Sequence, residues 1–171
     1  MINQVYILLG GNQGDVKETF IRAKSLIGER AGEIMAQSPL YQTEPWGFDA
    51  DELFYNQVLL LKSPLAPEAL LDTLLEIESV LGRTRNGKGY ASRNIDIDIL
   101  FYNDCILDSD HLTIPHPRMH LRNFALVPMA DISPGFVHPV LKQTISRLKD
   151  SSPDQHRVFV VTDVSIYPIS A

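Results

Sequence analysis

The order of apolar segments in this chain predicts an α+β fold of the ferredoxin-like type, a βαββαβ sandwich followed by a C-terminal extension. Two stripes of apolar residues recur at helical spacing, and short apolar runs of strand length precede and follow them. The run over residues 95–101 places apolar side chains at every second position, as a strand with one buried face does. No repeat, linker or low-complexity segment divides the 171 residues. We therefore expect a single domain over residues 1–171, with a motif-bearing core over about 4–142 and a tail over 143–171.

The expected elements, in chain order, are strand 4–9, helix 15–28, strand 34–41, strand 54–61, helix 67–82, strand 95–101, helix 123–130 and strand 157–164. The first helix begins with a capping box formed by Asp15 and Glu18, and Gly28 stands where a glycine commonly ends a helix. The second helix has Pro67 at its first position and Gly82 after its last apolar residue. In this arrangement helices cover one face of the sheet and leave the other face available for a ligand.

A glycine-rich turn over residues 10–14 follows the first strand. It lacks the Gly-Lys-Ser/Thr of a P-loop, so we interpret it as a tight connection between strand and helix, with phosphate binding as the minor alternative.

Two aspartates, Asp96 and Asp98, give the most specific chemical signal in the chain. They alternate with Ile95, Ile97, Ile99 and Phe101, so on a strand both carboxylates face the same way, about 6–7 Å apart at Cα. That spacing suits two hard cations bridged by phosphate. A simply solvated acidic pair is the alternative.

Basic residues lie directly before this acidic pair, among them Arg83, Arg85 and Arg93. Like charges on adjacent positions of one strand face repel each other unless a positive group lies near, and guanidinium groups bind phosphate through planar pairs of donors. The stretch therefore predicts a magnesium–polyphosphate site.

Aromatic and polar residues suggest a neighbouring site for a flat ring. Trp46 and Phe48 stand in a Pro/Gly-bearing loop, where they either pack onto the core or form a lid that stacks on a heterocycle. Asn56 could pair with the edge of such a ring or simply bond to backbone.

Four further residues have a structural or a functional interpretation. His116 and His120 have the spacing of helical metal ligands, but the prolines around His116 argue against a helix there, so a phosphate clamp of His116 with Arg122 is the preferred role. Glu78 lies at the edge of an apolar helical stripe, where a surface glutamate is the default and ligand contact the alternative.

Composition narrows the possible partners. Hydrophobic residues make up 44% and charged residues 21%, as in ordinary globular proteins, and the net charge of −6 argues against general nucleic-acid binding. Cys105 is the only cysteine, which excludes an intrachain disulfide. The apolar run over residues 5–9 is too short for a signal peptide or membrane span. We expect a cytoplasmic monomer that binds neither membrane nor nucleic acid.

Six blocks of residues, in order, give the chain a specific resemblance to a known family. They are Tyr6-Ile7-x-Leu9-Gly10-x-Asn12, Tyr41-x-Thr43-x-Pro45-x-Gly47, Asn56, Ile77-Glu78-x4-Arg83-x-Arg85, Arg93-x2-Asp96-x-Asp98-Ile99-Leu100, and Leu112-Thr113-x-Pro115-His116-x5-Arg122-x-Phe124. With these blocks the chain closely resembles the 6-hydroxymethyl-7,8-dihydropterin pyrophosphokinases of folate biosynthesis.

The resemblance implies a ferredoxin-like fold and transfer of pyrophosphate from ATP to the 6-hydroxymethyl oxygen of the pterin, with release of AMP. It implies that Asp96 and Asp98 bind two Mg²⁺ ions and that Arg83 and Arg93 bind the transferring phosphates. The residues implied to line the ATP site are Glu78, Arg85, Ile99, His116 and Arg122. Those implied to bind the pterin are Thr43, Trp46, Phe54, Asn56 and Phe124. Many relatives have Trp-Gly-Pro where this chain has Tyr90-Ala91-Ser92, which changes the backbone freedom of the loop before Arg93.

The sequence leaves two rival functions open. A nucleotidyltransferase also combines a glycine turn with two aspartates, but about eighty residues separate them here, and its product from ATP would be pyrophosphate rather than AMP. A non-catalytic ligand sensor on the same scaffold would bind without Mg²⁺ or turnover.

Overall fold

The computed structural model describes residues 1–12, 14–43, 54–82 and 95–161. Its elements, in chain order, are β1 Asn3–Gly11, α1 Val16–Arg30, β2 Glu33–Gln37, β3 Tyr41–Thr43, β4 Phe54–Ser63, α2 Pro67–Gly82, β5 Asp96–Tyr102, β6 Leu107–Asp108, β7 Thr113–Ile114, a 3₁₀ turn Met119–Leu121, α3 Asn123–Ile132, α4 Ile145–Asp150 and β8 Val158–Val160.

The main sheet has the strand order β5-β1-β4-β3-β8, and β2 also pairs with β4. Every pairing in this sheet is antiparallel, and β1 runs through its centre between β4 and β5. Helices α1 and α2 connect the strands in the order expected of a split βαβ arrangement. The predicted ferredoxin-like fold is confirmed, with β8 as an additional edge strand.

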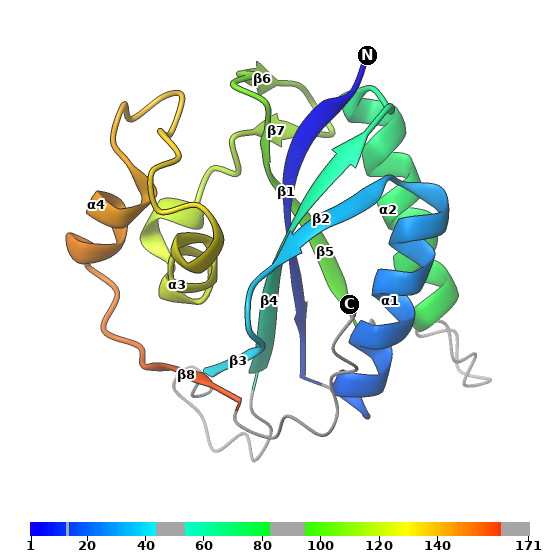
Figure 1. Ribbon diagram of the computed structural model, residues 1–171, viewed down its shortest axis with the longest axis horizontal. Coiled ribbons are helices and arrows are strands. Elements are labelled where there is room, and N and C mark those ends of the chain that lie inside the picture. The colour runs from blue at the N-terminus through cyan, green and yellow to red at the C-terminus, as the bar shows by residue number, and fades with distance from the viewer. Residues whose placement is uncertain (13, 44–53, 83–94, 162–171) are drawn as a thin grey trace.

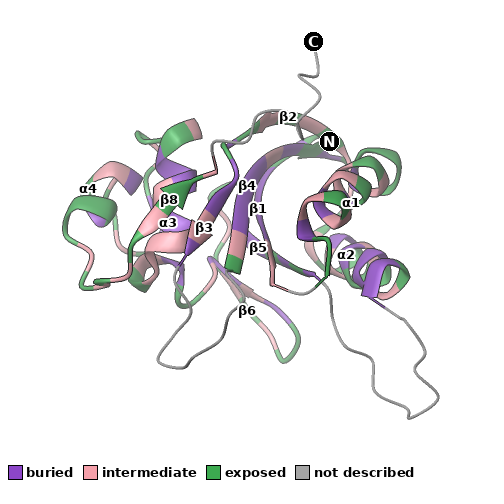
Figure 2. Ribbon diagram, turned by 90° about the horizontal axis from the view of Figure 1, so that it is seen from below, coloured by how far each residue is buried: buried purple, intermediate pink, exposed green. Residues whose placement is uncertain are grey.

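The elements form three layers. Helices α1 and α2 lie on one face of the sheet, and α3 and α4 lie on the other (Figure 1). The view from below shows the same separation (Figure 2). The expectation that the second face is left open is therefore wrong for most of its length, because α3 covers the apolar side chains there. The end of this face near the C-terminus of β1 is hollow.

A core lies on each side of the sheet. Phe20, Ile27 and Leu74 of α1 and α2 pack against one face. Leu8 and Val58 pack with residues of α3 on the other face. The predicted apolar stripes of both long helices are buried, because their i, i+3 and i+4 spacing places them on one side of each helix.

The predicted strand over residues 34–41 is in fact two strands, β2 and β3, which pair with successive parts of β4. The chain leaves the ladder at Ser38-Pro39, where proline has no backbone N–H to donate. Ser38 maintains the contact with β4: its hydroxyl accepts from Val58 N at 3.0 Å, and its carbonyl accepts from Gln57 Nε2 at 2.7 Å.

Gly28 does not end the first helix, as predicted, but lies inside α1, which continues to Arg30. The glycine required at this end is Gly32, whose N–H donates to the carbonyl of Ile27 at 3.1 Å. A Cβ at Gly32 would lie 2.3 Å from the Lys62 carbonyl oxygen, so the close approach of the backbones excludes any side chain.

The alternation of β5 breaks at Leu100. Tyr6 pairs with Phe101 and Ile7 with Ile99, so Leu100 is an extra residue in the strand. The prediction that Phe101 faces the same way as the isoleucines is therefore wrong: Ile99 packs under α1 and α2, whereas Phe101 packs under α3. A single bulged residue reverses the face of those that follow it.

The C-terminal part of the chain contains more structure than the sequence predicted. Helix α3 begins at Asn123 as expected and extends two residues further, to Ile132, with Pro128 inside it. The β6–β7 pair, the 3₁₀ turn and α4 were not predicted. Strand β8, Val158–Val160, lies within the expected strand over 157–164, of which residues 162–164 lie outside the described residues. In the described parts of the chain, every helix is too short or too polar to cross a membrane.

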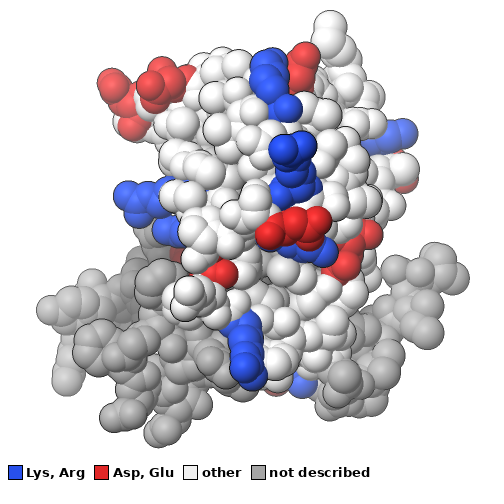
Figure 3. Space-filling view, turned by 90° about the vertical axis from the view of Figure 1, so that its left-hand side faces the viewer, with Lys and Arg blue, Asp and Glu red and all other residues white. Residues whose placement is uncertain are grey.

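The outer surface of the α3–α4 layer carries charges of both signs. Acidic side chains stand among the basic ones on this face, so its positive charge is partly offset (Figure 3).

Candidate active site

The candidate site is built on a row of directly paired residues that crosses the sheet. Gly10 on β1 pairs with Asn56 on β4 and with Asp96 on β5, and Asn56 pairs in turn with Tyr41 on β3. Directly paired residues share a face of the sheet. We call these four residues, Tyr41, Asn56, Gly10 and Asp96, the cross-strand row.

The neighbouring pairs place further site residues on the same face. Leu8, two residues before Gly10, pairs with Asp98, and Thr43 pairs with Phe54. Because side chains two residues apart on a strand point the same way, all of them face the α3 layer. Residues more than fifty positions apart in sequence thus meet on one surface.

A cavity of about 220 Å³ lies over this surface. Its lining residues are Leu8, Gly10, Gly11, Asn12, Thr43, Phe54, Asn56, Ile95, Asp96, Asp98, Arg122 and Phe124. The structure therefore brings together the predicted carboxylate pair, four of the predicted ring-binding residues, namely Thr43, Phe54, Asn56 and Phe124, and Arg122.

Gly10 allows the amide of Asn56 to reach the cavity. Asn56 is buried, with 6% of its surface exposed, and its Nδ2 donates to the Leu9 carbonyl at 3.3 Å. A Cβ at Gly10 would lie 3.0 Å from Asn56 Nδ2, closer than a side chain tolerates without movement. The bond to backbone that was the structural alternative for Asn56 is present, and the residue lines the cavity as well.

The cavity offers both polar and aromatic groups to a ligand. Thr43 Oγ1 is buried and has no hydrogen-bond partner among the described residues, which is costly unless a ligand or another group supplies one. Phe54 and Phe124 contribute aromatic rings, and the Arg122 guanidinium lies 5.5 Å from the centre of the Phe124 ring. Such a lining suits a flat, polar-edged heterocycle.

The two aspartates remain accessible while the isoleucines next to them are buried. Asp96 and Asp98 are exposed, whereas Ile97 and Ile99 pack into the helix-side core. In the parts of the chain that the structure describes, three metal-ligating side chains do not come together anywhere. The pair nevertheless fits Mg²⁺, which commonly takes one or two carboxylates and completes its shell with water and substrate phosphate.

Glu78 is a buried residue rather than a surface one, which corrects the default interpretation. Its Oε2 accepts from the backbone N–H of Ile97 at 2.8 Å. Because β5 is an edge strand, this N–H points away from the sheet, and the α2 side chain satisfies it. Glu78 thereby attaches α2 to the strand at the residue between the two aspartates.

His116 is held as a neutral imidazole beside the outer edge of β5. Its backbone N–H donates to Leu100 O at 2.9 Å, and its Nδ1 accepts from Arg118 N at 3.1 Å, which leaves the ring proton on Nε2. Burial, together with the charges of Arg122 and Arg118, lowers the pKa of His116 to about 4. The expected proximity of His116 to Arg122 is present, although His116 does not line the cavity.

Five predicted residues remain to be located. Ile99 packs in the helix-side core, so its side chain faces away from the cavity. Arg83, Arg85, Arg93 and Trp46 lie outside the described residues.

Sequence reasoning about individual positions missed part of the cavity. Leu8, Gly10, Gly11, Asn12 and Ile95 line it, although the glycine turn was interpreted as a simple connection. The available signal was the position of the turn at the end of a buried strand, together with Gly10 and Asn12 in the first family block.

Comparisons with known proteins give a family match. Residues 6–134 match the family model described as 7,8-dihydro-6-hydroxymethylpterin-pyrophosphokinase, HPPK. The chain is 40% identical over 138 residues to the 2-amino-4-hydroxy-6-hydroxymethyldihydropteridine pyrophosphokinase of Porphyromonas gingivalis, a match that covers 79% of this chain and 93% of that protein. The protein of the same name from Bacillus subtilis is 39% identical over 134 residues, 77% of this chain and 79% of that one.

Longer relatives contain a similar segment. A folic acid synthesis protein of Dictyostelium discoideum is 37% identical over 155 residues, and the match covers 89% of this chain but only 23% of that protein. The crystal structure of Plasmodium falciparum HPPK-DHPS has the same fold, with a TM-score of 0.71 at 18% identity over 88% of this chain and 43% of that one. The family match and the coverage of the bacterial relatives show that the chain belongs to the 7,8-dihydro-6-hydroxymethylpterin-pyrophosphokinase family.

Proposed function

We propose that this protein transfers the pyrophosphoryl group of ATP to the 6-hydroxymethyl oxygen of 6-hydroxymethyl-7,8-dihydropterin, releasing AMP, as a step of folate biosynthesis. Family membership supports the reaction. The observation that supports placing the reaction at this site is the cross-strand row, in which Asn56 and Asp96 flank Gly10 on the floor of one cavity. The proposed ring-binding and cation-binding groups thus lie on the two strands that flank β1.

The pterin is assigned to the side of the cavity formed by β3, β4 and the start of α3. The rings of Phe54 and Phe124 would bind its flat faces, while the Asn56 amide and the Thr43 hydroxyl would pair with its polar edge. Trp46 is proposed to belong to the same slot.

ATP is assigned to the side formed by β5. Asp96 and Asp98 are the residues that would hold two Mg²⁺ ions, which when bound offset the charge of the phosphate oxygens. Proposed contacts to the transferring phosphates are Arg83 and Arg93. The other proposed ATP contacts are Arg85, Arg122, His116, Glu78 and Ile99, the last through its main chain because its side chain is buried on the helix side of the sheet. Because the Nε2 of His116 carries the ring proton, it can donate to a phosphate oxygen without adding charge.

The reaction requires positioning more than covalent chemistry. The hydroxymethyl oxygen attacks the β-phosphorus, its proton is released, and the bond from that phosphorus to the α-phosphate oxygen breaks as AMP leaves. Charge accumulates on the phosphate oxygens, so guanidinium groups placed beside them stabilise the transition state electrostatically. The rigid sheet keeps the two substrates aligned, which contributes through proximity.

The test is product analysis with ATP, Mg²⁺ and 6-hydroxymethyl-7,8-dihydropterin, in parallel for the wild type, Asp96→Ala and Asp98→Ala. We expect AMP only when the pterin is present, and a loss of roughly a hundredfold or more in kcat for either variant. Asp110→Ala is the matched control, because Asp110 is exposed between β6 and β7 and does not line the cavity. An aspartate variant with near-normal turnover would contradict the two-ion assignment.

The same assay separates the rival functions. Pyrophosphate in place of AMP would indicate nucleotidyl transfer, and pterin binding that needs neither Mg²⁺ nor turnover would indicate a ligand sensor. We also propose that the protein acts as a monomer in the cytoplasm. Light scattering of the purified protein measures its oligomeric state.

A further inference from the structure

Helix α3 begins at the cavity, yet the residue at its start cannot cap it. Arg122 occupies the N-cap position with φ −131° and ψ 113° and makes no side-chain capping bond. A guanidinium group has donors only, so it cannot accept from the unpaired N–H groups of the first helical turn. Arg122 lines the cavity, next to Phe124 in the first turn of α3.

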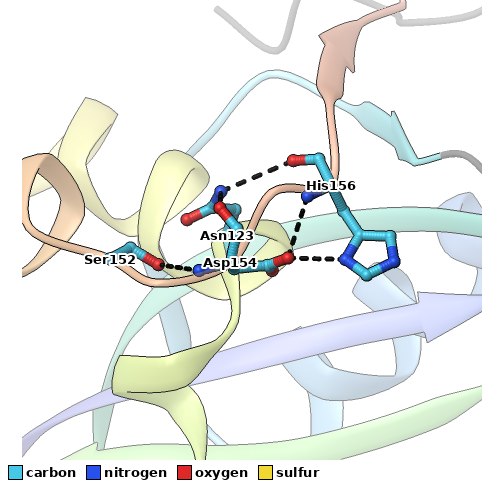
Figure 4. Close-up of polar contacts among 4 residues, drawn as sticks. All are labelled: Asn123, Ser152, Asp154 and His156. Carbon is cyan, nitrogen blue, oxygen red and sulfur yellow. Dashed lines mark hydrogen bonds and ion pairs between the residues drawn. The ribbon is translucent and has the colours of Figure 1, made fainter.

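The C-terminal extension supplies the missing cap (Figure 4). Asp154 Oδ2 accepts from the backbone N–H of Asn123 at 2.8 Å. In return, Asn123 Nδ2 donates to the Asp154 carbonyl at 2.9 Å and lies 3.4 Å from the His156 carbonyl oxygen. A carboxylate at this position also interacts favourably with the helix dipole.

Asp154 is itself held in place by its neighbours in the extension. Its second oxygen, Oδ1, accepts from His156 N at 2.9 Å and contacts His156 Nδ1 at 2.5 Å, while Asp154 N donates to Ser152 Oγ at 3.2 Å. Only 4% of the Asp154 side chain is exposed. Burial by itself would raise the pKa of this carboxyl, but the hydrogen bonds from Asn123 and His156 lower it below its usual value, so the charged form is favoured.

The extension then continues to the opposite wall of the cavity. Strand β8 pairs antiparallel with β3, with Val158 opposite the site residue Thr43 and Val160 opposite Tyr41. Val161 N extends this contact by donating to Leu40 O at 2.8 Å. One short segment thus bonds to α3 and β3, two of the three elements that carry the proposed ring-binding residues.

We propose that residues 152–160 form a clasp that sets the geometry of the pterin slot, with Asp154 as the positioning residue. By capping α3 from outside, Asp154 leaves the N-cap position free for an arginine that faces the ligand, and it fixes the turn that carries Phe124. This inference rests on the proposed function. The clasp lies beyond residues 6–134, the stretch that matches the family model.

The test compares two cap-removing variants in steady-state kinetics. Asp154→Ala removes the cap of α3, and Thr144→Ala removes that of α4, where Thr144 Oγ1 accepts from Arg147 N at 3.2 Å away from the cavity. Both variants are expected to lower the melting temperature. Only Asp154→Ala is expected to raise KM for the pterin, by roughly tenfold, which corresponds to about 1.4 kcal/mol of binding free energy. Thr144→Ala should stay within about twofold of the wild type.

The conservative variant Asp154→Asn keeps an oxygen acceptor and is expected to recover most of the pterin affinity, as measured by titration calorimetry. If Asp154→Ala does not fold, Asn123→Ala carries the test, because it removes the bonds from Asn123 Nδ2 to the Asp154 and His156 carbonyls and is expected to raise KM for the pterin. An unchanged KM for Asn123→Ala would then overturn the clasp, as would equal KM values for a folded Asp154→Ala and Thr144→Ala. Absence of AMP formation by the wild type would instead reject the proposed function, independently of the clasp.

Discussion

At the scale of single residues, two glycines in this chain have opposite surroundings. Gly10 lies in the cross-strand row, where an added Cβ would meet Asn56 Nδ2 at 3.0 Å. Gly28 lies inside α1, and an added Cβ there would meet nothing within 4 Å. A glycine-to-alanine substitution therefore tests the geometry of the ligand site at Gly10 and helix propensity at Gly28.

For Gly10→Ala we expect KM for the pterin to rise by roughly three- to tenfold, because the methyl group displaces the Asn56 amide by a few tenths of an ångström. Gly28→Ala is the matched control. It should leave KM unchanged and raise the free energy of unfolding by about 0.5–1 kcal/mol, since alanine is the better helix former. Steady-state kinetics and urea unfolding measure the two effects. A normal KM in Gly10→Ala would show that Asn56 does not require its present position.

Residue roles also show where inference from single positions fails. The sequence identified Glu78 by default as a surface residue, whereas it is buried and bonds to the Ile97 N–H. That role depends on β5 being an edge strand, which only the strand order reveals. A residue that satisfies a backbone group from another element has no local signature.

At the scale of elements, α3 is attached to the sheet at its C-terminal end as well as at its start. The Tyr41 hydroxyl donates to the Asp131 carboxylate, and the hydroxyls of Tyr6 and Ser133 lie 2.5 Å apart. These bonds join the helix to β3 and β1, the strands that also form the cavity floor.

Tyr41→Phe is expected to lower the free energy of unfolding by about 1.5–3 kcal/mol, because it removes a hydrogen bond to a charged group. Tyr102→Phe is the control: its hydroxyl donates to the neutral Leu65 carbonyl at 2.6 Å, so a loss of only about 0.5–1.5 kcal/mol is expected. Urea unfolding at pH 7 measures both. Equal losses would show that the charge of Asp131 adds nothing.

Tyr41 should also make the free energy of unfolding depend on pH in the alkaline range. Burial, followed by the hydrogen bond to Asp131 and its negative charge, raises the pKa of this phenol. Above pH ~10 the unfolded chain loses the tyrosine proton while the folded protein keeps it, so stability should fall as pH rises. Tyr41→Phe is expected to weaken this dependence between about pH 9.5 and 11, and an unchanged slope would contradict the assignment.

At the scale of the whole molecule, buried histidines make the protein sensitive to acid. Burial, with the charge of His120 as a smaller cause, lowers the pKa of His138 to about 4, and His116 has a similar value. His138 Nδ1 accepts from Val140 N at 3.2 Å and Leu141 N at 3.0 Å, which requires the neutral ring. The fold around the α3 layer therefore depends on uncharged imidazoles.

We expect the contribution of these histidines to the free energy of unfolding to be constant above pH ~6.5 and to fall as pH decreases toward about 4, because in this range the unfolded chain binds protons that the folded protein does not. His138→Gln should reduce the slope, whereas His111→Gln, at an exposed position, should not. Denaturant unfolding between pH 4 and 7 measures the difference. Equal slopes for the two variants would contradict the role of His138.

Much of the fold could be predicted because the pattern of burial is local. Helical spacing identified α1 and α2, and alternation identified β5, since one face of each element must leave water. The break between β2 and β3 and the bulge at Leu100 could not be predicted in this way. Both depend on how β4 and β1 pair with their neighbours. The assignment of residues 1–171 to a single domain stays a prediction.

The sequence by itself determined the family and the residue types of the site, because its motifs keep chemically specific side chains at fixed spacing. Only the tertiary structure decided which of them share one cavity, because strand register brings Gly10, Asn56 and Asp96 together across three strands. It also decided the part played by the extension, which carries no motif. Asp154 caps a helix that begins 31 residues earlier, and a hydrogen bond over that distance depends on packing rather than on local pattern.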